Sequence, residues 1–398
     1  MQKPISKLDL KSRSILILTM DYPPAKGGIQ TYSRELAVNL VNKGFRIIVL
    51  TVGVRKADMR INGVSCIRCP GPFRFPIFGP SFFIILYIFY TLVISLIYKP
   101  KIIHVIQWYP CGLAALFVHK CLRIKYVVST HGLEIYSTLL YSRDFFKKLM
   151  KIILEEASTV IAVSKFTCEL VLQITKRVNI EVIPPFFNYT ILSKRKPNPN
   201  KIIARHKLQG RCVLLTVGRL IERKGHDTVI RALPKILEKK SNVVYLIVGD
   251  GPNRRKLEKL AENLGVKDKV IFTGEVPDQD LIDYYSICDV FIMPCREIRG
   301  RGDIEGFGIV FIEAMFFGKP IIAGRSGGAV DPIIHGIVGF QVNPYDPEEV
   351  AERVIQLLSN KKIRHQMSKN AKNYIKKYYP EFLINRIINV YEHTILIN

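Results

Sequence analysis

The stretch CVLLTVGRLIERKGHD, residues 212–227, joins an uninterrupted apolar run to a short basic loop. Residues 212–217 hold no charged side chain and are rich in β-branched residues, which is typical of a strand covered on both faces of a parallel sheet. Arg219 and Lys224 follow in the loop past the strand's carboxyl end, where open α/β sheets bind ligands. A guanidinium and an ammonium there can neutralise a diphosphate, although an Arg–Lys loop taken alone also fits ordinary solvated surface.

Signals for strands and helices alternate along the whole chain of 398 residues. In the first half we expect strands at 14–19, 46–51, 102–105, 125–129, 160–163 and 180–183. In the second half we expect them at 212–217, 243–248, 269–273, 290–293 and 320–323. This alternation predicts an α/β protein with two doubly wound parallel sheets, and the length suits two domains. Residues 194–200, with two prolines, are expected to link the domains.

A second informative stretch is EGFGIVFIEA, residues 305–314. Glu305 precedes a glycine-flanked bend, and Glu313 stands eight residues further on, about two turns into an expected helix. Glycines allow close backbone approach, and free amides at a helix start suit an anion, so the amides of Phe307, Gly308 and Ile309 are candidate donors to a phosphate or sugar. Taken alone, the same pattern fits a solvated glutamate at a helix N-terminus.

The chain contains four spaced motifs: Gly27-Gly28, His131-Gly132, Arg219 with Lys224-Gly225, and the pair Glu305 and Glu313. They occur in the order found in the retaining glycosyltransferases of family 4, and the chain resembles that family over nearly its whole length. Within the family, the segments DYPPAKGGIQTY, STHGLE, GRLIERKGHD and CREIRGRGDIEGFGIVFIEA are most similar to the phosphatidylinositol mannosyltransferases that use GDP-mannose.

The resemblance implies the GT-B fold, in which two Rossmann-like doubly wound parallel-sheet domains face each other across a cleft. It implies an N-terminal acceptor-binding domain over residues 1–196 and a nucleotide-sugar-binding domain over residues 197–379. The last segment, residues 380–398, is expected as a helix that returns to the N-terminal domain. Two positions depart from the family pattern: residues 184–188 read PPFFN in place of a glycine turn leading to an aspartate, and Asp331 stands where a glutamate is common.

The resemblance also implies a reaction, the transfer of a hexose from a nucleoside diphosphate sugar to a hydroxyl with retention at the anomeric carbon. The subfamily points to mannose from GDP-mannose and to a lipid-linked or glycolipid acceptor. The catalytic residues implied are Arg219, Lys224, His131 and Glu305. The donor-binding residues implied are Gly27, Gly28, Arg219, Lys224, Gly274, Val276, Glu305, Phe307, Gly308, Ile309 and Glu313.

Neither a cofactor nor a bound metal is expected. Asp278 and Asp280 form a D-x-D pair of the kind that can hold a divalent ion, but they stand at a helix start, where carboxylates are ordinary caps. Cys66 and Cys69 form a C-x2-C pair without a second ligand pair, so we expect free thiols.

The basic charge is unevenly distributed. The formal net charge is +26, and residues 1–200 carry 28 basic and 10 acidic side chains against 31 and 23 in the remainder. Such a field attracts polyanions or an anionic membrane surface. Nucleic acid is not expected as a partner, since no nucleic-acid motif is found. Residues 143–152 fit a basic amphipathic helix at a membrane interface, or equally an ordinary half-buried surface helix.

Residues 75–98 contain no charged side chain and are long enough to span a bilayer. Because the flanking segments 14–19 and 102–105 are expected in one sheet, we interpret the run as a helix packed on that sheet, with one face open to lipid. The polar, basic opening of the chain, residues 1–13, does not read as a secretion signal. We therefore expect a cytoplasmic protein, peripheral at the cytoplasmic face of the membrane.

Two other functions remain open from the sequence. One is a transferase that uses a UDP- or ADP-sugar and a soluble or polysaccharide acceptor, which would not need the basic N-terminal half. The other is a non-catalytic module that binds a sugar nucleotide or a nucleic acid. The base, the sugar, the acceptor and the linkage are not fixed by these residues.

Overall fold

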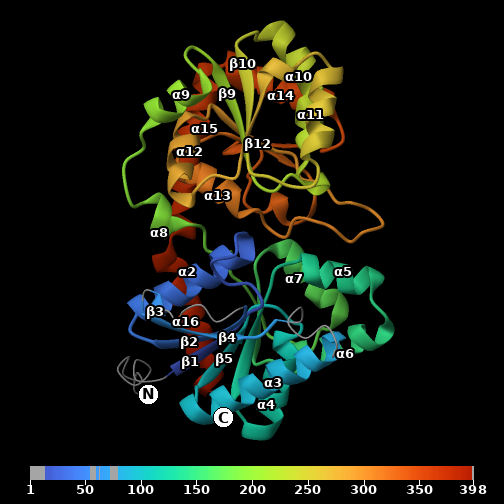
Figure 1. Cartoon of the computed structure of the whole chain (residues 1–398), viewed down its shortest axis with the longest axis vertical. Helices are drawn as coiled ribbons and strands as arrows, with labels where there is room; N and C mark the ends of the chain where they lie inside the picture. Colours follow the sequence, from blue (N-terminus) through green and yellow to red (C-terminus); the bar gives the residue numbers. More distant parts are fainter. Residues whose placement is uncertain (1–13, 54–59, 62, 72–78, 397–398) are drawn as a thin grey trace. The chain divides into compact units, whose positions relative to one another are not determined.

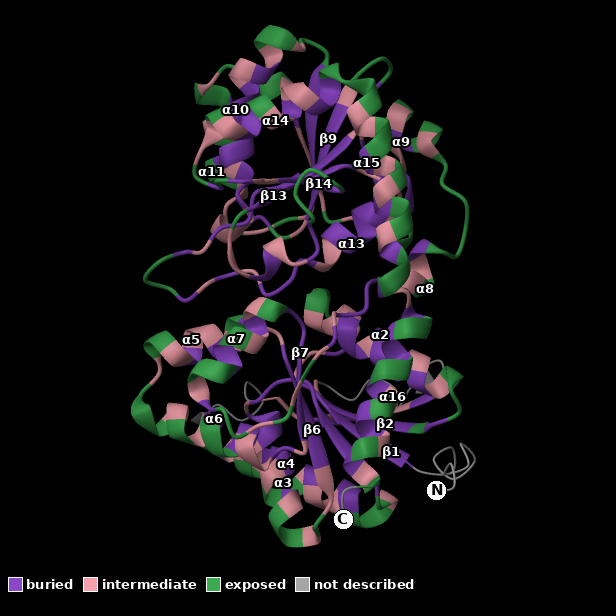
Figure 2. Ribbon diagram, turned by 180° about the vertical axis from the view of Figure 1, so that it is seen from behind, coloured by how far each residue is buried: buried purple, intermediate pink, exposed green. Residues whose placement is uncertain are grey.

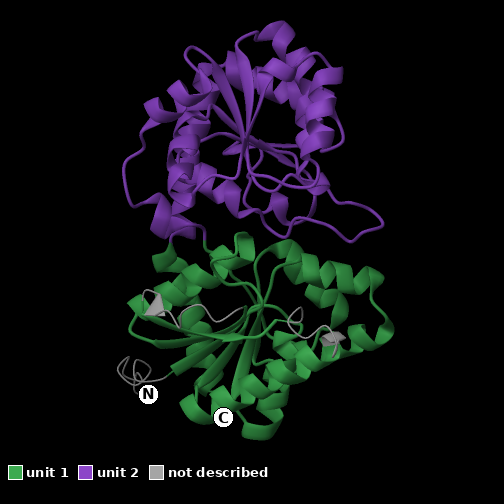
Figure 3. Cartoon of the chain, in the orientation of Figure 1, with its two compact units in different colours: residues 1–186, 380–398 green, residues 187–379 purple. Residues whose placement is uncertain are grey.

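The computed structural model describes residues 14–53, 60, 61, 63–71 and 79–396. The chain forms two compact units, the first made of residues 1–186 and 380–398 and the second of residues 187–379 (Figure 3). Most strands of both units are buried, while the outward turns of their helices are exposed (Figure 2). The units are described one at a time.

Unit 1 is built on an eight-stranded sheet in the order β3-β4-β2-β1-β5-β6-β7-β8 (Figure 1). Its pairs are parallel except the edge pair β3/β4. The strands are β1 (Ser14–Leu18), β2 (Arg46–Val52), β3 (Arg60–Ile61), β4 (Val64–Cys69), β5 (Ile102–Val105), β6 (Lys125–Thr130), β7 (Thr159–Ala162) and β8 (Ile180–Val182).

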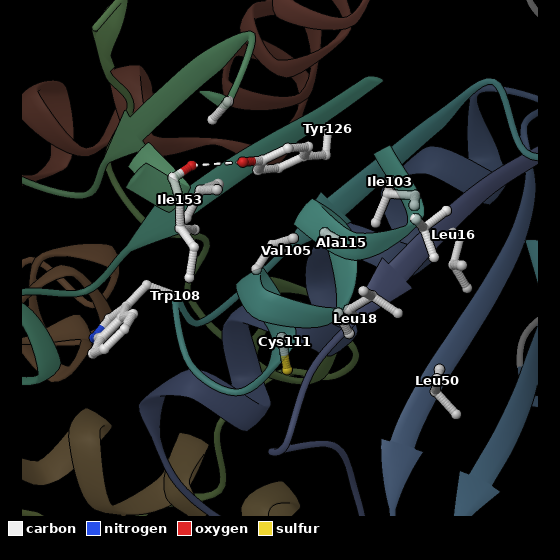
Figure 4. Packing of buried hydrophobic residues seen from close by; sticks show 14 of the residues in the cluster. Leu16, Leu18, Leu50, Ile103, Val105, Trp108, Cys111, Ala115, Tyr126 and Ile153 are labelled. Carbon is white, nitrogen blue, oxygen red and sulfur yellow. Dashed lines mark hydrogen bonds between the residues drawn. The ribbon is translucent and has the colours of Figure 1, made fainter. Parts of the chain in front are cut away.

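Helices cover both faces of this sheet, because its central strands are apolar on both sides. One layer contains α3 (Gly79–Tyr98), α4 (Cys111–Leu122) and α6 (Asp144–Glu156), with α5 (Leu133–Tyr141) and α7 (Lys165–Ile174) beside them. The other contains α2 (Gly28–Asn42) and the final helix α16 (Pro380–Leu396). In the first layer, the Tyr126 hydroxyl of β6 donates a 2.7 Å hydrogen bond to the carbonyl of Ile153 in α6 (Figure 4).

Helix α3 packs on the sheet as expected. Phe83, Tyr87 and Ile94 are buried in the core shared with β1 and β5, which pair in parallel. It is the one helix in the described part of the chain that is long and apolar enough to cross a membrane. The start of the apolar run, including Pro76, lies outside the described residues.

Unit 2 is built on a six-stranded parallel sheet in the order β11-β10-β9-β12-β13-β14. The strands are β9 (Cys212–Val217), β10 (Val243–Val248), β11 (Val270–Gly274), β12 (Val290–Met293), β13 (Ile321–Gly324) and β14 (Gly339–Val342). The helices are α8 (Tyr189–Leu192), α9 (Pro199–His206), α10 (His226–Lys239), α11 (Arg254–Asn263), α12 (Leu281–Ile287), α13 (Ile309–Phe316), α14 (Pro347–Ser359) and α15 (Lys361–Tyr374). Both sheets confirm the predicted doubly wound α/β class.

The boundary at residue 196 and the linker at 194–200 were wrong. Residues 187–196 belong to unit 2, where Tyr189 packs on Phe316 and Tyr379, and Arg195 forms two hydrogen bonds of 2.9 and 2.8 Å with the Asp283 carboxylate. Pro199 begins α9 because a proline at the first helical position loses no hydrogen bond.

Candidate active site

In unit 2, the loops that follow β9 and β12 lie at the same edge of the sheet, because the two strands are parallel neighbours. The loop after β9 begins with Gly218, whose carbonyl would lie 2.1 Å from a Cβ added to Gly249. Only a glycine at residue 249 allows this approach. Arg219 follows and is exposed, and no hydrogen bond or ion pair to its guanidinium is found in the described ranges. Its five donors are therefore open to a ligand at this edge.

The same edge holds an ion-paired cluster. Lys224 Nζ donates to Glu305 Oε2 at 2.7 Å, and Arg223 Nε reaches the same oxygen at 3.3 Å. Arg223 also pairs with Asp303 at 2.5 Å. The side chains of Lys224 and Glu305 are only 11% and 13% exposed, so solvent weakens their attraction little. Two motifs that lie 81 residues apart in the chain thus meet in space.

The pKa of Glu305 reports the strength of this cluster. Burial alone would raise it, but the charges of Lys224 and Arg223 and their hydrogen bonds outweigh burial and lower the pKa to about 2. Glu305 is therefore ionised at neutral pH, and its carboxylate pairs with both cations.

The backbone around Glu305 is fixed by a second glycine pair. Gly328, in the turn after β13, donates its N–H to the Glu305 carbonyl at 2.8 Å. A Cβ at Gly328 would lie 1.8 Å from the Gly306 carbonyl, so no larger residue fits. Gly308 then adopts a φ of 87° and begins α13 at Ile309. The first amides of a helix have no intrahelical acceptor, which leaves those of α13 available to an anion.

Glu313 lies inside α13 and is 5% exposed. The Tyr285 hydroxyl donates a 2.7 Å hydrogen bond to Glu313 Oε2, and the Tyr285 ring stacks on Phe317 at 5.5 Å. Burial, followed by the nearby Glu313 charge, raises the pKa of Tyr285 well above its usual value, so the hydroxyl stays a donor. Glu313 is thus an oriented acceptor rather than a solvated surface carboxylate.

The remaining unit 2 candidates lie at the loop after β11. Gly274 ends that strand with a φ of 70°, and its carbonyl accepts from the Gly249 N–H at 2.9 Å. Val276 follows in the same loop and is half-buried. Asp280 stands at the start of α12, as expected, but it makes no side-chain cap hydrogen bond and pairs with Lys201 at 3.0 Å instead. No cluster of three or more His, Cys, Asp or Glu side chains that would hold a metal is found among the described residues.

In unit 1, Gly27 and Gly28 lie at the start of α2, after the loop that follows β1. Gly27 has a φ of 151°, and a Cβ there would lie 2.5 Å from Gln30 Oε1. Asp21 orients this loop, because its two carboxylate oxygens accept from Gln30 Nε2 at 2.8 Å and from Gln107 Nε2 at 2.5 Å. The need for an unusual backbone therefore accounts for Gly27, while the free amides of α2 remain available to a ligand.

His131 follows β6 at the carboxyl edge of the unit 1 sheet. Its Nε2 is buried and has no hydrogen-bond partner in the described part of the chain. Burial lowers the pKa of His131 to about 4, although a hydrogen bond to the Ile106 backbone opposes this, so the imidazole is neutral at pH 7. The ring meets Tyr32 edge-on, with the ring centroids 4.9 Å apart, and the backbone N–H of His131 donates to Glu134 Oε1 at 2.6 Å. An unpaired, buried imidazole nitrogen is costly unless a ligand uses it.

Sequence reasoning missed four side chains that position these groups. Arg223 and Tyr285 hold the two glutamates, and Asp21 and Glu134 hold the unit 1 loops. Glu134 could have been predicted, because an acid three residues after His131 can accept the backbone N–H of that residue. Burial raises the pKa of Glu134 to about 7.

The structure thus gathers the predicted residues into two groups that lie in separate units. Unit 2 brings Arg219, Lys224, Glu305, Gly308 and Ile309 to one edge of its sheet, with Phe307 buried behind them. Unit 1 places Gly27, Gly28 and His131 after β1 and β6, the two strands that flank β5 in the sheet and pair with it in parallel.

Comparison with known proteins shows that the chain is similar to glycosyltransferases over most of its length. Residues 199–374 match the family described as Glycosyl transferases group 1, and residues 26–190 match Glycosyltransferase Family 4. Over 362 residues the chain is 33% identical to a GDP-mannose-dependent alpha-(1-6)-phosphatidylinositol monomannoside mannosyltransferase of Mycobacterium tuberculosis, which covers 86% of this chain and 89% of that protein.

Solved structures agree on the fold. A glycosyltransferase from Rickettsia africae superposes with a TM-score of 0.80 at 22% identity, covering 97% of this chain and 99% of that one. The Anabaena protein Alr3699/HepE, solved with UDP-glucose, superposes with a TM-score of 0.77 at 20% identity, covering 95% and 98%.

Proposed function

The chain belongs to the group 1/family 4 glycosyltransferases, and we propose that it transfers mannose from GDP-mannose to a hydroxyl of a lipid-linked acceptor at a membrane surface. The observation that carries the proposal is the edge of the unit 2 sheet, where Arg219 is open and Lys224 is held by Glu305. Relatives named as GDP-mannose-dependent mannosyltransferases, at 33% and 31% identity, support the choice of donor.

In this proposal the two cations act on the leaving group. Arg219 binds the diphosphate by forked hydrogen bonds, and Lys224 stabilises the charge that grows on it as the bond from the anomeric carbon to the phosphate oxygen breaks. The amides of Phe307, Gly308 and Ile309 add donors at the start of α13. Because these groups supply positive charge, we expect no metal requirement.

The remaining residues take the sugar and the nucleoside. Glu305 accepts hydrogen bonds from hydroxyls of the hexose, and Glu313 accepts them from those of the ribose. The backbone at Gly274 and Val276 contacts the base. The neutral His131 Nε2 accepts a hydroxyl of the transferred sugar. The acceptor hydroxyl forms the new bond on the face that the diphosphate leaves, and its proton passes to the departing phosphate oxygen, so the anomeric configuration is retained.

The proposal places the protein on the cytoplasmic face of the membrane. Two observations support this: the excess of basic side chains in residues 1–200, and the apolar helix α3, in which only 28% of the segment Ser81–Tyr98 is buried. An anionic lipid surface attracts such a protein, and a lipid-linked acceptor is reached there.

The test is thermal stability with GDP-mannose, UDP-glucose, UDP-N-acetylglucosamine or ADP-glucose, each with and without EDTA. A ligand that binds only the folded protein at about a hundredfold its Kd adds roughly 2.7 kcal/mol to the unfolding free energy. We expect that stabilisation with GDP-mannose alone, followed by turnover with a phosphatidylinositol mannoside acceptor. Stabilisation by a UDP- or ADP-sugar would overturn the donor assignment, and binding without turnover on any acceptor would indicate a binding module.

A further inference from the structure

A chain of four buried polar side chains crosses the layer between the unit 1 sheet and the helices α2 and α16. Its members come from four elements: Tyr32 from α2, His104 from β5, Ser129 from β6 and Tyr391 from α16. None of them is more than 1% exposed. A polar group at such a depth costs free energy unless it is hydrogen-bonded, so each of these side chains depends on its partners.

Three hydrogen bonds join the four groups end to end. The Tyr391 hydroxyl lies 2.5 Å from His104 Nδ1, and His104 Nε2 lies 2.7 Å from Ser129 Oγ. Ser129 Oγ in turn lies 2.9 Å from the Tyr32 hydroxyl. Among the described residues, no other side-chain hydrogen bond is found for any of the four. Loss of one member therefore leaves its neighbour without a partner.

His104 passes the effect of Tyr391 along the chain through its choice of tautomer. Burial, and then the neighbouring His131, lower the pKa of His104 to about 3, so its imidazole is neutral. A neutral imidazole accepts through one nitrogen and donates through the other. Burial raises the pKa of Tyr391 well above its usual value, so its hydroxyl keeps a proton to donate to Nδ1. His104 then carries its own proton on Nε2 and donates it to Ser129.

The other end of the chain leads to His131. Ser129, which holds the Tyr32 hydroxyl, stands two residues before His131 in the sequence. The Tyr32 ring meets the His131 ring edge-on, with the centroids 4.9 Å apart and the planes at 79°, and it packs on Phe186 at 5.8 Å. Because Tyr32 is held both at its hydroxyl and at its ring, it gives the imidazole of His131 a fixed surface to rest on.

His131 needs support of this kind. Its Nε2 is buried and has no hydrogen-bond partner in the part of the chain that the structure describes. A nitrogen that is kept free for a ligand cannot also hold its own ring in place, so the neighbours of the ring must do so. The precision matters, because a displacement of about 1 Å in an active site can cost about 100-fold in rate.

An anchor for the last helix is the competing explanation. The chain ties α16 to the sheet against which it packs (Figure 1), and buried polar groups can specify how an element docks. Tyr126 shows what such an anchor looks like, because its hydroxyl donates to the Ile153 carbonyl at 2.7 Å in the other layer of the same sheet. The chain from Tyr391 differs because it continues to a residue of the candidate site.

We propose that Tyr391 and His104 are positioning residues for His131. They act through Ser129 and Tyr32, so the last helix of the protein contributes to the unit 1 site. The inference rests on the proposed function for what His131 does in hexose transfer. The effect of the Tyr391 hydroxyl on the His131 ring is expected with or without transfer, so the two can fail separately.

The test compares variants of the full-length protein that each remove one buried hydroxyl. Tyr391→Phe removes the far end of the chain, and Ser129→Ala removes a central member. Tyr126→Phe is the matched control, because it removes a buried tyrosine hydroxyl from the other layer of the same sheet. Urea titrations report the stability of all three.

The first measurement is kcat and KM with GDP-mannose and a phosphatidylinositol mannoside acceptor. Tyr391→Phe and Ser129→Ala should lower kcat about 10- to 100-fold and leave KM for GDP-mannose within about threefold. Tyr126→Phe should keep kcat within about twofold of the wild type, although it too loses a buried hydrogen bond. In a His131→Asn background, Tyr391→Phe should change kcat by less than about twofold more, because a positioning residue acts only through the group that it positions.

The second measurement needs no substrate. In protein labelled with ¹⁵N at histidine, the ring signals of His131 are identified by their loss in His131→Asn. They should move in Tyr391→Phe and in Ser129→Ala and keep their wild-type positions in Tyr126→Phe. An anchor for α16 alone would change stability without moving these signals.

Three results would overturn the inference: His131 signals that stay in place in both chain variants, equal losses of kcat in Tyr391→Phe and Tyr126→Phe, or independent losses from Tyr391→Phe and His131→Asn. If Tyr391→Phe does not fold, Ser129→Ala decides. Signals that move as expected in a protein that transfers no hexose would remove the proposed function and leave the positioning chain intact. Normal transfer with unmoved signals would remove the positioning chain alone.

Discussion

Replacement of Lys224 by alanine should separate catalysis from folding. Lys224 Nζ lies 2.7 Å from Glu305 Oε2, and Arg223 Nε remains 3.3 Å from that oxygen when the lysine is gone. Loss of one partner from a buried pair costs about 3 to 5 kcal/mol when it leaves a charge alone. Because Arg223 still neutralises Glu305, we expect roughly 1 to 2 kcal/mol here. Loss of a preorganised charge on a leaving group lowers turnover about 100- to 1,000-fold.

The assay is kcat for mannose transfer at saturating GDP-mannose, together with urea unfolding of the same preparation. Lys235→Ala is the matched control, because Lys235 also pairs with a glutamate, Glu348, at 2.5 Å, but on the exposed side of α10. The control should keep its kcat and its stability within the ordinary range of a surface substitution. A Lys224→Ala enzyme with kcat within about threefold of the wild type would refute the reasoning and remove Lys224 from the mechanism.

Three further predictions concern the groups around this pair. Because its pKa in the folded protein is lowered from 4.5 to about 2, Glu305 contributes stability above about pH 4.5 that is lost as the pH falls toward 2. In urea titrations over that range, the wild type should lose about 3 kcal/mol more of its unfolding free energy than Glu305→Gln. Equal losses would contradict the pairing. Tyr285→Phe leaves Glu313 without its donor and should raise the Kd for GDP about fivefold to tenfold in calorimetric titrations, while an unchanged Kd would show that Glu313 does not need this orientation. His131 is neutral above about pH 5, so the pH–rate profiles of the wild type and of His131→Asn should have the same shape near pH 6.5. An inflection near pH 6.5 that is present in the wild type and lost in His131→Asn would mean that the imidazole works in its charged form.

The strands that the sequence predicts best are those buried on both faces. The run from Val243 to Val248 holds no polar side chain except that of Tyr245, and the predicted bounds are those of β10. The missed strands are β3, β4 and β14. Strand β3 has only two residues, and Arg68 in β4 and Gln341 in β14 interrupt the apolar pattern of short strands. An interrupted pattern gives a weaker signal for a strand.

Prediction of the site residues depended on motifs in the same way. Arg219, Lys224, Glu305 and Glu313 were predicted because motifs at the ends of strands and at helix starts have readable spacing. Their partners were not found, since contacts such as that of Tyr285 with Glu313 depend on how α12 and α13 pack. Sequence fixes which loops reach an edge of the sheet, whereas packing decides which side chains face one another.

The charges of the unit 2 site explain why it needs both a free and a paired cation. Lys224 and Arg223 carry two positive charges, and Glu305 and Asp303 carry two negative charges, so the cluster is neutral as a whole. In the proposed mechanism, the charge that attracts a diphosphate to this edge is therefore that of Arg219, which is exposed. In that mechanism, Lys224 exchanges Glu305 for the phosphate, and Arg223 keeps Glu305 compensated. An exposed arginine thus suits capture of the donor, and a lysine with a replaceable partner suits the later step in which charge grows on the leaving group.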